Sequence, residues 1–194
     1  MRSPARRVAG FHYDYSELQV RQNPAPGVVI TTNAASAQIN GVEFSATLLP
    51  VKGLRLEAGG SYLHATYQKF TEGTAVLDGN YLARAPKFQI HGVIDYDFNL
   101  GRFGDLDSSL TLQHQSKQYF NEFNTALLTG GAFTTLDGRL TWSPMGAKAF
   151  TVSLIAKNLT DKRYITNVLA LANIYYDATV NQPRSFMVDL RYKF

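Results

Sequence analysis

The sequence predicts an all-β fold built from long antiparallel strands. The first observation is a strict alternation of apolar and polar residues over long segments, which matches the two-residue period of a strand and not the spacing of a helix. The second is the composition, with 11 Tyr and 12 Phe among 194 residues, because aromatic side chains favour pleated surfaces. The third is a series of Gly- and Pro-containing turns that separates the alternating segments.

The alternation is clearest in residues 42–49, 88–99, 106–117 and 134–143. In each of these segments, apolar residues occupy one face and Asp, Glu, Ser, Thr or Gln occupy much of the other. We expect about eight strands, at residues 11–20, 28–49, 53–70, 86–99, 105–121, 132–143, 149–163 and 183–194.

The connections between these strands alternate in length. We expect short turns at residues 50–53, 100–104 and 144–148, and longer loops at 21–27, 71–85, 122–131 and 165–182. Short turns at one end and long loops at the other are typical of an outer-membrane barrel. Several segments also exceed the ~9–11 residues that a tilted strand needs to cross a bilayer. The predicted fold is therefore a portion of an antiparallel transmembrane β-barrel.

The last predicted strand shows why alternation alone does not orient the sheet. Phe186, Val188, Leu190, Tyr192 and Phe194 fall on one face, and Met187, Asp189, Arg191 and Lys193 on the other. A soluble barrel would turn the apolar face inward, and a membrane barrel would turn it toward lipid. Aromatic residues at strand ends favour the membrane barrel, because they resemble an interfacial girdle: Phe88, Phe98, Trp142, Tyr192 and Phe194.

Composition and motifs argue against several other classes of protein. The chain has no cysteine, so it has neither disulfides nor a thiolate metal site. The net charge is +4 and the charges are spread singly, a pattern that does not suggest nucleic-acid binding. No run of eighteen apolar residues predicts a transmembrane helix, and the residues after the basic start do not resemble a signal peptide. We expect no enzyme activity, because the motifs of hydrolase elbows, zinc proteases and phosphate loops are lacking.

Several stretches resemble TonB-dependent outer-membrane receptors. They are FHYDYSELQV (Phe11–Val20), TNAASAQINGVEFSATLLPVKGLRLEAGGSYLHATY (Thr32–Tyr67), NLTDKRY (Asn158–Tyr164) and the closing PRSFMVDLRYKF (Pro183–Phe194). Together they cover nearly the whole chain in the order in which the family has them. The resemblance implies a location in the outer membrane of a Gram-negative bacterium and a role in importing a scarce nutrient, such as a ferric siderophore, cobalamin or an oligosaccharide.

The resemblance also implies what such a receptor needs beyond these strands. The family has a plug domain inside a barrel of about 22 strands, and we expect this chain to hold only the carboxy-terminal strands. Residues 1–10 are expected to form a basic segment before a barrel portion at 11–194. The expected partners are outer-membrane lipid, the barrel assembly machinery and a small-molecule nutrient. Coupling to the TonB system is expected only in a full-length receptor. We therefore do not expect this chain to transport a nutrient by itself.

Two other classes of protein fit parts of the same pattern. Eight strands suffice to close a small barrel, so a self-contained outer-membrane barrel with a structural or adhesion role is one alternative. A soluble lipocalin-like binder is the other, and it predicts shorter strands and a polar exterior.

The candidate contact residues lie in the long loops, which would be extracellular. Tyr81, Tyr175 and Tyr176 are the candidate ligand contacts, with an upper aromatic girdle as the alternative role. By resemblance, the last strand, with Phe186, Val188, Leu190, Tyr192 and Phe194, carries the assembly signal.

Other polar residues are expected to be structural. NLTDKRY is expected to form a strand end in which Asn and Asp bind nearby backbone, and Glu43 to pair with a basic residue of a neighbouring strand. His12, His64, His91 and His114 lie on separate predicted strands, so no metal or other cofactor is expected.

Overall fold

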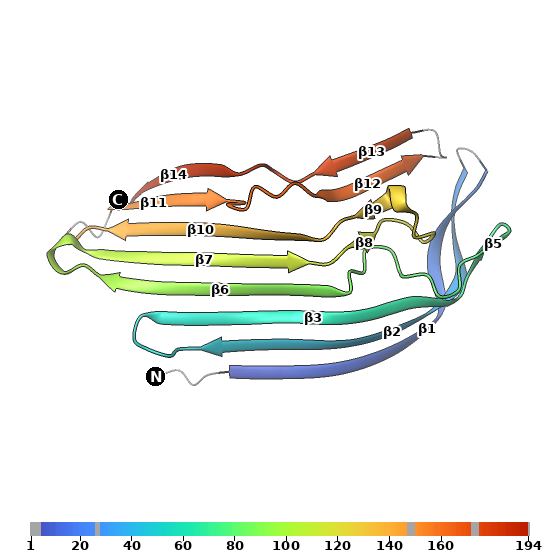
Figure 1. Ribbon diagram of the computed structural model, residues 1–194, viewed down its shortest axis with the longest axis horizontal. Helices are drawn as coiled ribbons and strands as arrows, with labels where there is room; N and C mark the ends of the chain where they lie inside the picture. The colour runs from blue at the N-terminus through green and yellow to red at the C-terminus, as the bar shows by residue number, and fades with distance from the viewer. Residues whose placement is uncertain (1–4, 26–27, 147–149, 172–174, 194) are drawn as a thin grey trace.

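The computed structural model describes residues 5–25, 28–146, 150–171 and 175–193. Its main element is a single antiparallel sheet of eight strands in the order β1-β2-β3-β6-β7-β10-β11-β14, as Figure 1 shows. The strands of this sheet are β1 (Ala5–Ala25), β2 (Val28–Leu48), β3 (Leu54–Lys69), β6 (Phe88–Asn99), β7 (Asp105–Gln115), β10 (Phe133–Ser143), β11 (Phe150–Lys157) and β14 (Ser185–Tyr192). The predicted all-β antiparallel fold is confirmed.

Three small hairpins lie at one end of the sheet, called the loop end below. They are β4 (Thr71–Glu72) with β5 (Ala75–Val76), β8 (Gln118–Tyr119) with β9 (Thr129–Gly130), and β12 (Ile165–Leu171) with β13 (Tyr175–Val180). Two single 3-10 turns complete the described structure, η1 (Gly101–Phe103) and η2 (Ala126–Leu128). Within the described residues, no helix is long and apolar enough to cross a membrane.

The register keeps the two faces of the sheet separate from strand to strand. Val42 pairs with Tyr62, and Tyr62 pairs with Phe88. One residue further along β2, Glu43 pairs with Ser61, and Ser61 with Gln89. Because paired residues point to the same side, the apolar alternation of each strand adds up to a continuous apolar surface.

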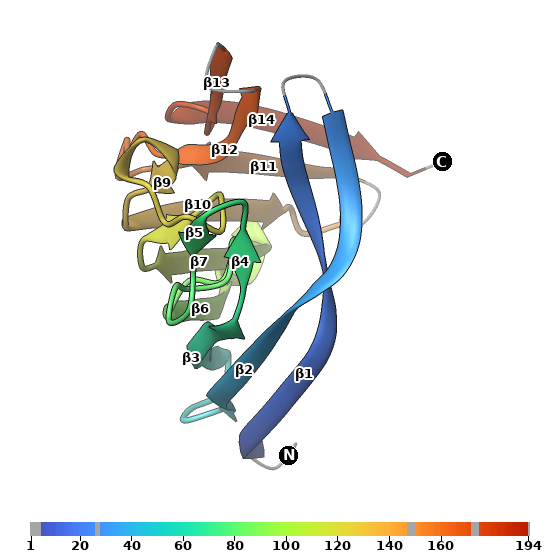
Figure 2. The same cartoon turned by 90° about the vertical axis from the view of Figure 1, so that its right-hand side faces the viewer.

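The sheet is curved and open. Figure 2 looks along the strands and shows β3, β6, β7, β10, β11 and β14 arranged as a curved wall. β1 and β14 are the two edges, and in the described part of the chain they are not paired with each other. The long hairpin of β1 and β2 extends past the ends of the other strands of the eight-stranded sheet and bends across its loop end, as Figures 1 and 2 both show.

Several predicted boundaries were wrong. β1 begins at Ala5 and not at 11, so residues 5–10 belong to the sheet, and it continues to Ala25 through most of the loop expected at 21–27. A bulge precedes the part of β1 that was missed at its carboxy-terminal end: Tyr15 pairs with Ala37 but Leu18 pairs with Ala35, and Glu17 has φ 56°. An extra residue inverts the alternation beyond it, so the pattern conceals the rest of the strand.

Other predicted strands end earlier in the structure. β7 stops at Gln115 instead of 121, and β11 stops at Lys157 instead of 163. After β11 the backbone turns through Asn158 and Asp161, both at φ 50°. The loop expected at 165–182 contains the hairpin of β12 and β13.

Among the residues whose burial the structure describes, the cluster of buried apolar side chains lies at the loop end. It forms where the inner side of the β1–β2 hairpin meets the hairpin of β4 and β5, and its members are Val20, Ala35, Ala37, Tyr67, Phe70 and Leu77. Phe70 is 2% exposed. Elsewhere the described sheet is a single layer with two open faces, so its apolar residues stay exposed.

Candidate functional site

One face of the sheet, called the apolar face below, consists of large apolar side chains from all eight strands. Each of those listed here is between 38% and 75% exposed: Val8, Val42, Phe44, Tyr62, Phe88, Ile90, Ile94, Leu110, Leu112, Leu140, Leu154, Phe186, Val188, Leu190 and Tyr192. A soluble monomer rarely exposes a contiguous apolar surface of this kind, so the surface is made to contact another apolar phase.

The opposite face, called the charged face, holds ion pairs between strands and within single strands. They are Arg55 with Asp95 at 3.1 Å and with Glu57, Lys157 with Asp137 at 2.7 Å, Arg191 with Asp189 at 3.6 Å, and Arg139 with Asp189 at 3.9 Å. Pairs of this kind contribute roughly 0.2–1 kcal/mol each where water reaches them. Their concentration on one side predicts that this face meets water.

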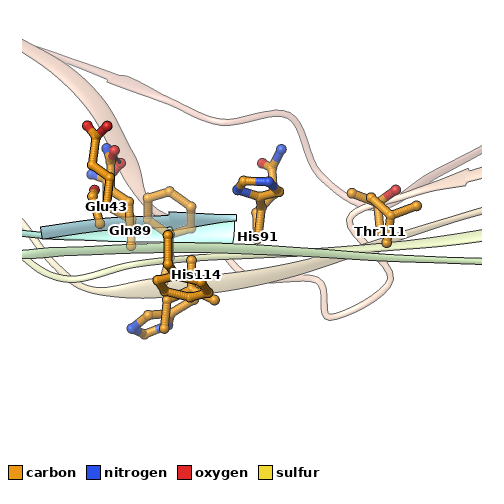
Figure 3. A pocket seen from close by; sticks show the side chains of 13 residues that line it. Glu43, Gln89, His91, Thr111 and His114 are labelled. Atoms are coloured by element: carbon orange, nitrogen blue, oxygen red, sulfur yellow. Dashed lines mark hydrogen bonds between the residues drawn. The ribbon is translucent and has the colours of Figure 1, made fainter. Parts of the chain in front are cut away.

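The charged face also has an open hollow of about 610 Å³ between β2, β3, β6, β7 and β10. Figure 3 shows Glu43, Gln89, His91 and Thr111 projecting from one side of the sheet and His114 from the other. The expected ion pair between Glu43 and a basic residue of a neighbouring strand is not formed among the described residues. Glu43 is paired in the sheet with Ala9 and Ser61, and no ion pair of the described residues includes it. Its carboxylate therefore lines the hollow without a protein cation.

Toward the loop end, the charged face becomes aromatic. Phe11, Tyr13 and Tyr15 lie on the same side of β1, with ring centroids 5.4 Å and 6.2 Å apart. Tyr13 is 51% exposed and Tyr15 is 45% exposed. We call these three rings the β1 ladder. Sequence reasoning did not select it as a contact site, although the alternating aromatics of FHYDY carried the information.

The structure places Tyr81 on the apolar-face side of the sheet. Tyr81 forms an isolated bridge to Thr66, which shares a side of β3 with His64. Its ring stacks on Tyr119 at 6.2 Å and meets the His64 ring edge-on at 5.7 Å. The ammonium of Lys87 lies 4.3 Å from the Tyr81 centroid. The Tyr81 ring thus lies on the side of β3 that carries His64, and its role as a ligand contact or a girdle residue stays a prediction.

Tyr175 and Tyr176 lie on β13, where they pair with Leu171 and Ala170. They are 54% and 41% exposed. Their role as ligand contacts stays a prediction.

Asn124 fixes the position of Tyr81 and was not selected from the sequence. Its Oδ1 accepts from Tyr81 N at 2.7 Å and its Nδ2 donates to Tyr81 O at 2.8 Å. The neighbouring Glu122 accepts from Asn80 through its backbone oxygen at 2.9 Å. Burial, with a further contribution from Glu72, raises the pKa of the Glu122 carboxyl above its ordinary range. Contacts across 43 residues of sequence cannot be found from local patterns.

The histidines lie on β1, β3, β6 and β7. His12 hydrogen-bonds Asn40 at 2.6 Å and Asp14 at 2.9 Å, and Asn40 pairs with His64 on β3. His91 and His114 face opposite sides of the sheet, as Figure 3 shows. Among the described residues, no group of three or more His, Asp or Glu side chains is placed to hold a metal ion.

The structural interpretation of NLTDKRY is confirmed. Asn158, 7% exposed, donates from Nδ2 to Lys162 O and to Gln182 O, both at 3.1 Å. Its Oδ1 accepts from Lys162 N at 3.1 Å. Asp161 accepts from Arg184 N at 3.2 Å. These bonds join the end of β11 to the start of β14, so the motif locks a turn.

The predicted assembly strand is β14. Phe186, Val188, Leu190 and Tyr192 share the apolar face and are 60% to 70% exposed. Phe194 lies outside the described residues, so its part in the assembly signal stays a prediction.

An antiparallel sheet with an apolar face, an ion-paired opposite face, short turns at one end and hairpin loops at the other defines part of a transmembrane β-barrel. The family model for the TonB dependent receptor-like beta-barrel matches residues 7–159, which is more than half of the chain. The chain therefore belongs to this family, whose barrels lie in the outer membrane.

Solved structures of this family show the same fold. The ferric yersiniabactin uptake receptor FyuA from Yersinia pestis is 22% identical, with a TM-score of 0.82 over 98% of this chain and 28% of that one. The siderophore receptor PiuA from Acinetobacter baumannii is 19% identical, with a TM-score of 0.77 over 98% of this chain and 26% of that one. The ferric preacinetobactin receptor BauA, from the same species, is 24% identical, with a TM-score of 0.72 over 98% and 27%. The chain thus spans less than a third of these receptors, and no curated protein sequence matches it.

Proposed function

We propose that this chain is the carboxy-terminal barrel part of a receptor that takes up a scarce nutrient of the siderophore-iron, cobalamin or oligosaccharide class. The observation that carries the proposal is the division of the sheet into an apolar and an ion-paired face within a member of the TonB-dependent receptor family. In a bilayer, the apolar face must contact lipid, so the charged face lines the interior.

The open edges support a part of a barrel over a self-contained one. Unpaired backbone groups in lipid cost several kcal/mol each, so β1 and β14 need further strands or each other. The eight-stranded sheet leaves them apart, and the similar receptors are more than three times as long. We infer that transport needs the plug and the TonB system of a full-length receptor.

The β1 ladder is the candidate nutrient contact. It lies on the interior side at the loop end, where a ligand entering from outside would arrive first. Stacked aromatic rings offer apolar and cation–π contacts to a planar or cationic ligand, and the Tyr13 and Tyr15 hydroxyls add hydrogen-bonding groups. Tyr13 and Tyr15 are 51% and 45% exposed, so a ligand reaches them without unfolding of the sheet.

Uptake by cells tests this proposal. A full-length receptor that contains these strands together with a plug is produced in cells that have the TonB system and lack other receptors, and accumulation of labelled ferric siderophores, cobalamin and oligosaccharides is measured. We expect one class to accumulate, and Tyr13→Ala with Tyr15→Ala to lower its uptake about tenfold or more at equal outer-membrane abundance. Tyr13→Phe, which keeps the ring, serves as the matched control. Failure of every class to accumulate would overturn the receptor assignment.

A further inference from the structure

A second cluster lies on the opposite side of the sheet from the β1 ladder. It consists of Tyr81, Tyr119, Lys87 and Lys117, and we call it the rim cluster. The ammonium of Lys87 lies 4.3 Å from the Tyr81 centroid, and that of Lys117 lies 5.2 Å from the Tyr119 centroid. The two tyrosine rings are stacked at 6.2 Å with an interplanar angle of 15°. Two cations are thereby held over one aromatic platform.

The contacts of Tyr81 show which side of the sheet the rim cluster occupies. Tyr81 bridges Thr66 and touches His64, and alternate residues of β3 continue this side to Tyr62. Tyr62 packs on Phe88 at 4.9 Å, and this pair is the last of the apolar face toward the loop end. The rim cluster therefore lies directly beyond the edge of the apolar face, on the same side.

Among the described residues, no ion pair includes Lys87 or Lys117, and the sheet's own pairs use the charged face instead. Asp14, which lies on the same side of the sheet on β1, is hydrogen-bonded to His12 and Gln38. Lys87 is half-buried and Lys117 is exposed. The positive charge of the cluster is therefore available to an external anion.

We propose that the rim cluster binds the phosphate of a lipid headgroup in the outer leaflet of the outer membrane. A surface at the edge of the lipid-facing band contacts lipid headgroups. A headgroup that binds here must complement two ammonium groups and two phenol hydroxyls. Phosphate does so, because lysine binds it as a point charge and its oxygens accept from hydroxyl donors. Aromatic side chains are also enriched at this depth of a membrane. The inference needs the barrel to lie in a membrane, which the family shows, and does not need the nutrient proposal.

Lipid binding by the purified protein tests the proposal. The protein is extracted in mild detergent and titrated with lipid A, a phosphorylated glycolipid, and bound lipid is counted by native mass spectrometry. Each surface lysine contributes about fivefold to the affinity for an anionic headgroup. We expect Lys87→Gln with Lys117→Gln to weaken lipid A binding roughly 25-fold and Lys87→Arg with Lys117→Arg to keep it within about threefold. Lys52→Gln, which changes an exposed lysine in the turn at the other end of the strands, should leave binding unchanged.

Two further arms identify the ligand. The first arm titrates the unaltered protein with lipid A from which the phosphates have been removed. Its affinity should fall to about that of the double Gln variant for intact lipid A. Inorganic phosphate at millimolar concentration should not displace lipid A. Equal binding of lipid A by the double Gln variant, equal binding of the phosphate-free lipid, or displacement by inorganic phosphate would each overturn the proposal. Nutrient uptake by the double Gln variant should stay within about twofold, which separates this result from the uptake test.

Discussion

Asn124 holds Tyr81 by both of its backbone polar groups, with Oδ1 accepting from Tyr81 N at 2.7 Å and Nδ2 donating to Tyr81 O at 2.8 Å. The side-chain amide thus forms the pair of hydrogen bonds that a neighbouring strand residue would form. It connects the loop before β6 to the loop after β8. Asn124 itself has φ 54°, a conformation that asparagine tolerates better than most residues. One side chain therefore connects two loops that are distant in sequence.

Replacing Asn124 with Ala should free the Tyr81 segment locally. Loss of the two bonds costs about 1–3 kcal/mol, so exchange of the Tyr81 amide hydrogen should speed up about fivefold to 150-fold. Hydrogen-exchange mass spectrometry of a peptide spanning residues 77–85 measures this. Asn124→Gly loses the same bonds without the strain that Ala has at a positive φ, so its faster exchange measures the loss of the bonds alone. Slower exchange in the Gly variant than in the Ala variant would point to backbone strain as the cause.

The two faces of β14 should respond oppositely to a charge. Val188→Lys places an ammonium on the apolar face and should destabilise the membrane-inserted protein by about 2–4 kcal/mol. Met187→Lys places the same charge one residue earlier, on the face that holds Asp189 and Arg191, and should cost less than about 1 kcal/mol. Urea unfolding in lipid vesicles compares the two. Equal destabilisation would contradict the assignment of the faces.

Deletion of Phe194 should impair assembly and not ligand binding. The resemblance of the last strand to the family's closing segment motivates this expectation. We expect the fraction of protein that shows heat-modifiable migration in outer-membrane preparations to fall at least severalfold. Phe194→Tyr, which keeps an aromatic terminus, is the control and should assemble normally. Unchanged assembly after the deletion would refute the predicted role.

Glu122 should make the loop end more stable in mild acid than at neutral pH. Its pKa is raised in the folded state by burial first and by Glu72 second. A carboxyl with a raised folded pKa favours folding when protonated, so this contribution is fully present below the ordinary glutamate value and is lost as pH rises through the raised one. Glu122→Gln should remove this pH dependence and slow exchange of the loop amides at pH 7. An unchanged pH profile in the Gln variant would contradict the assignment.

The repeating chemistry of the strands could be predicted from the sequence. The alternation in 88–99 and 134–143 is local, and its two-residue period fits only an extended strand, so both strands appear within two residues of their expected bounds. The turn chemistry of Asn158 and Asp161 is also local and was predicted correctly, although β11 ends earlier than expected. The bulge at Glu17 broke the pattern and concealed the continuation of β1.

The candidate sites were less predictable, because they depend on contacts between distant segments. Tyr81 was selected from the sequence, yet its partners Tyr119, Lys87 and Asn124 were not. Phe11, Tyr13 and Tyr15 are visible as alternating aromatics, but their side of the sheet follows from the pairing of Phe11 with Gly41.

By itself, the sequence determined that this protein is made of long amphipathic strands with short turns at one end, because side-chain alternation and turn residues act over a few positions. Only the tertiary structure decided which strands pair, how the β1–β2 hairpin bends across the loop end, and which aromatic and basic side chains meet on each face. Hydrogen bonds between distant strands set that register, and a shift of one residue would exchange the apolar and charged faces.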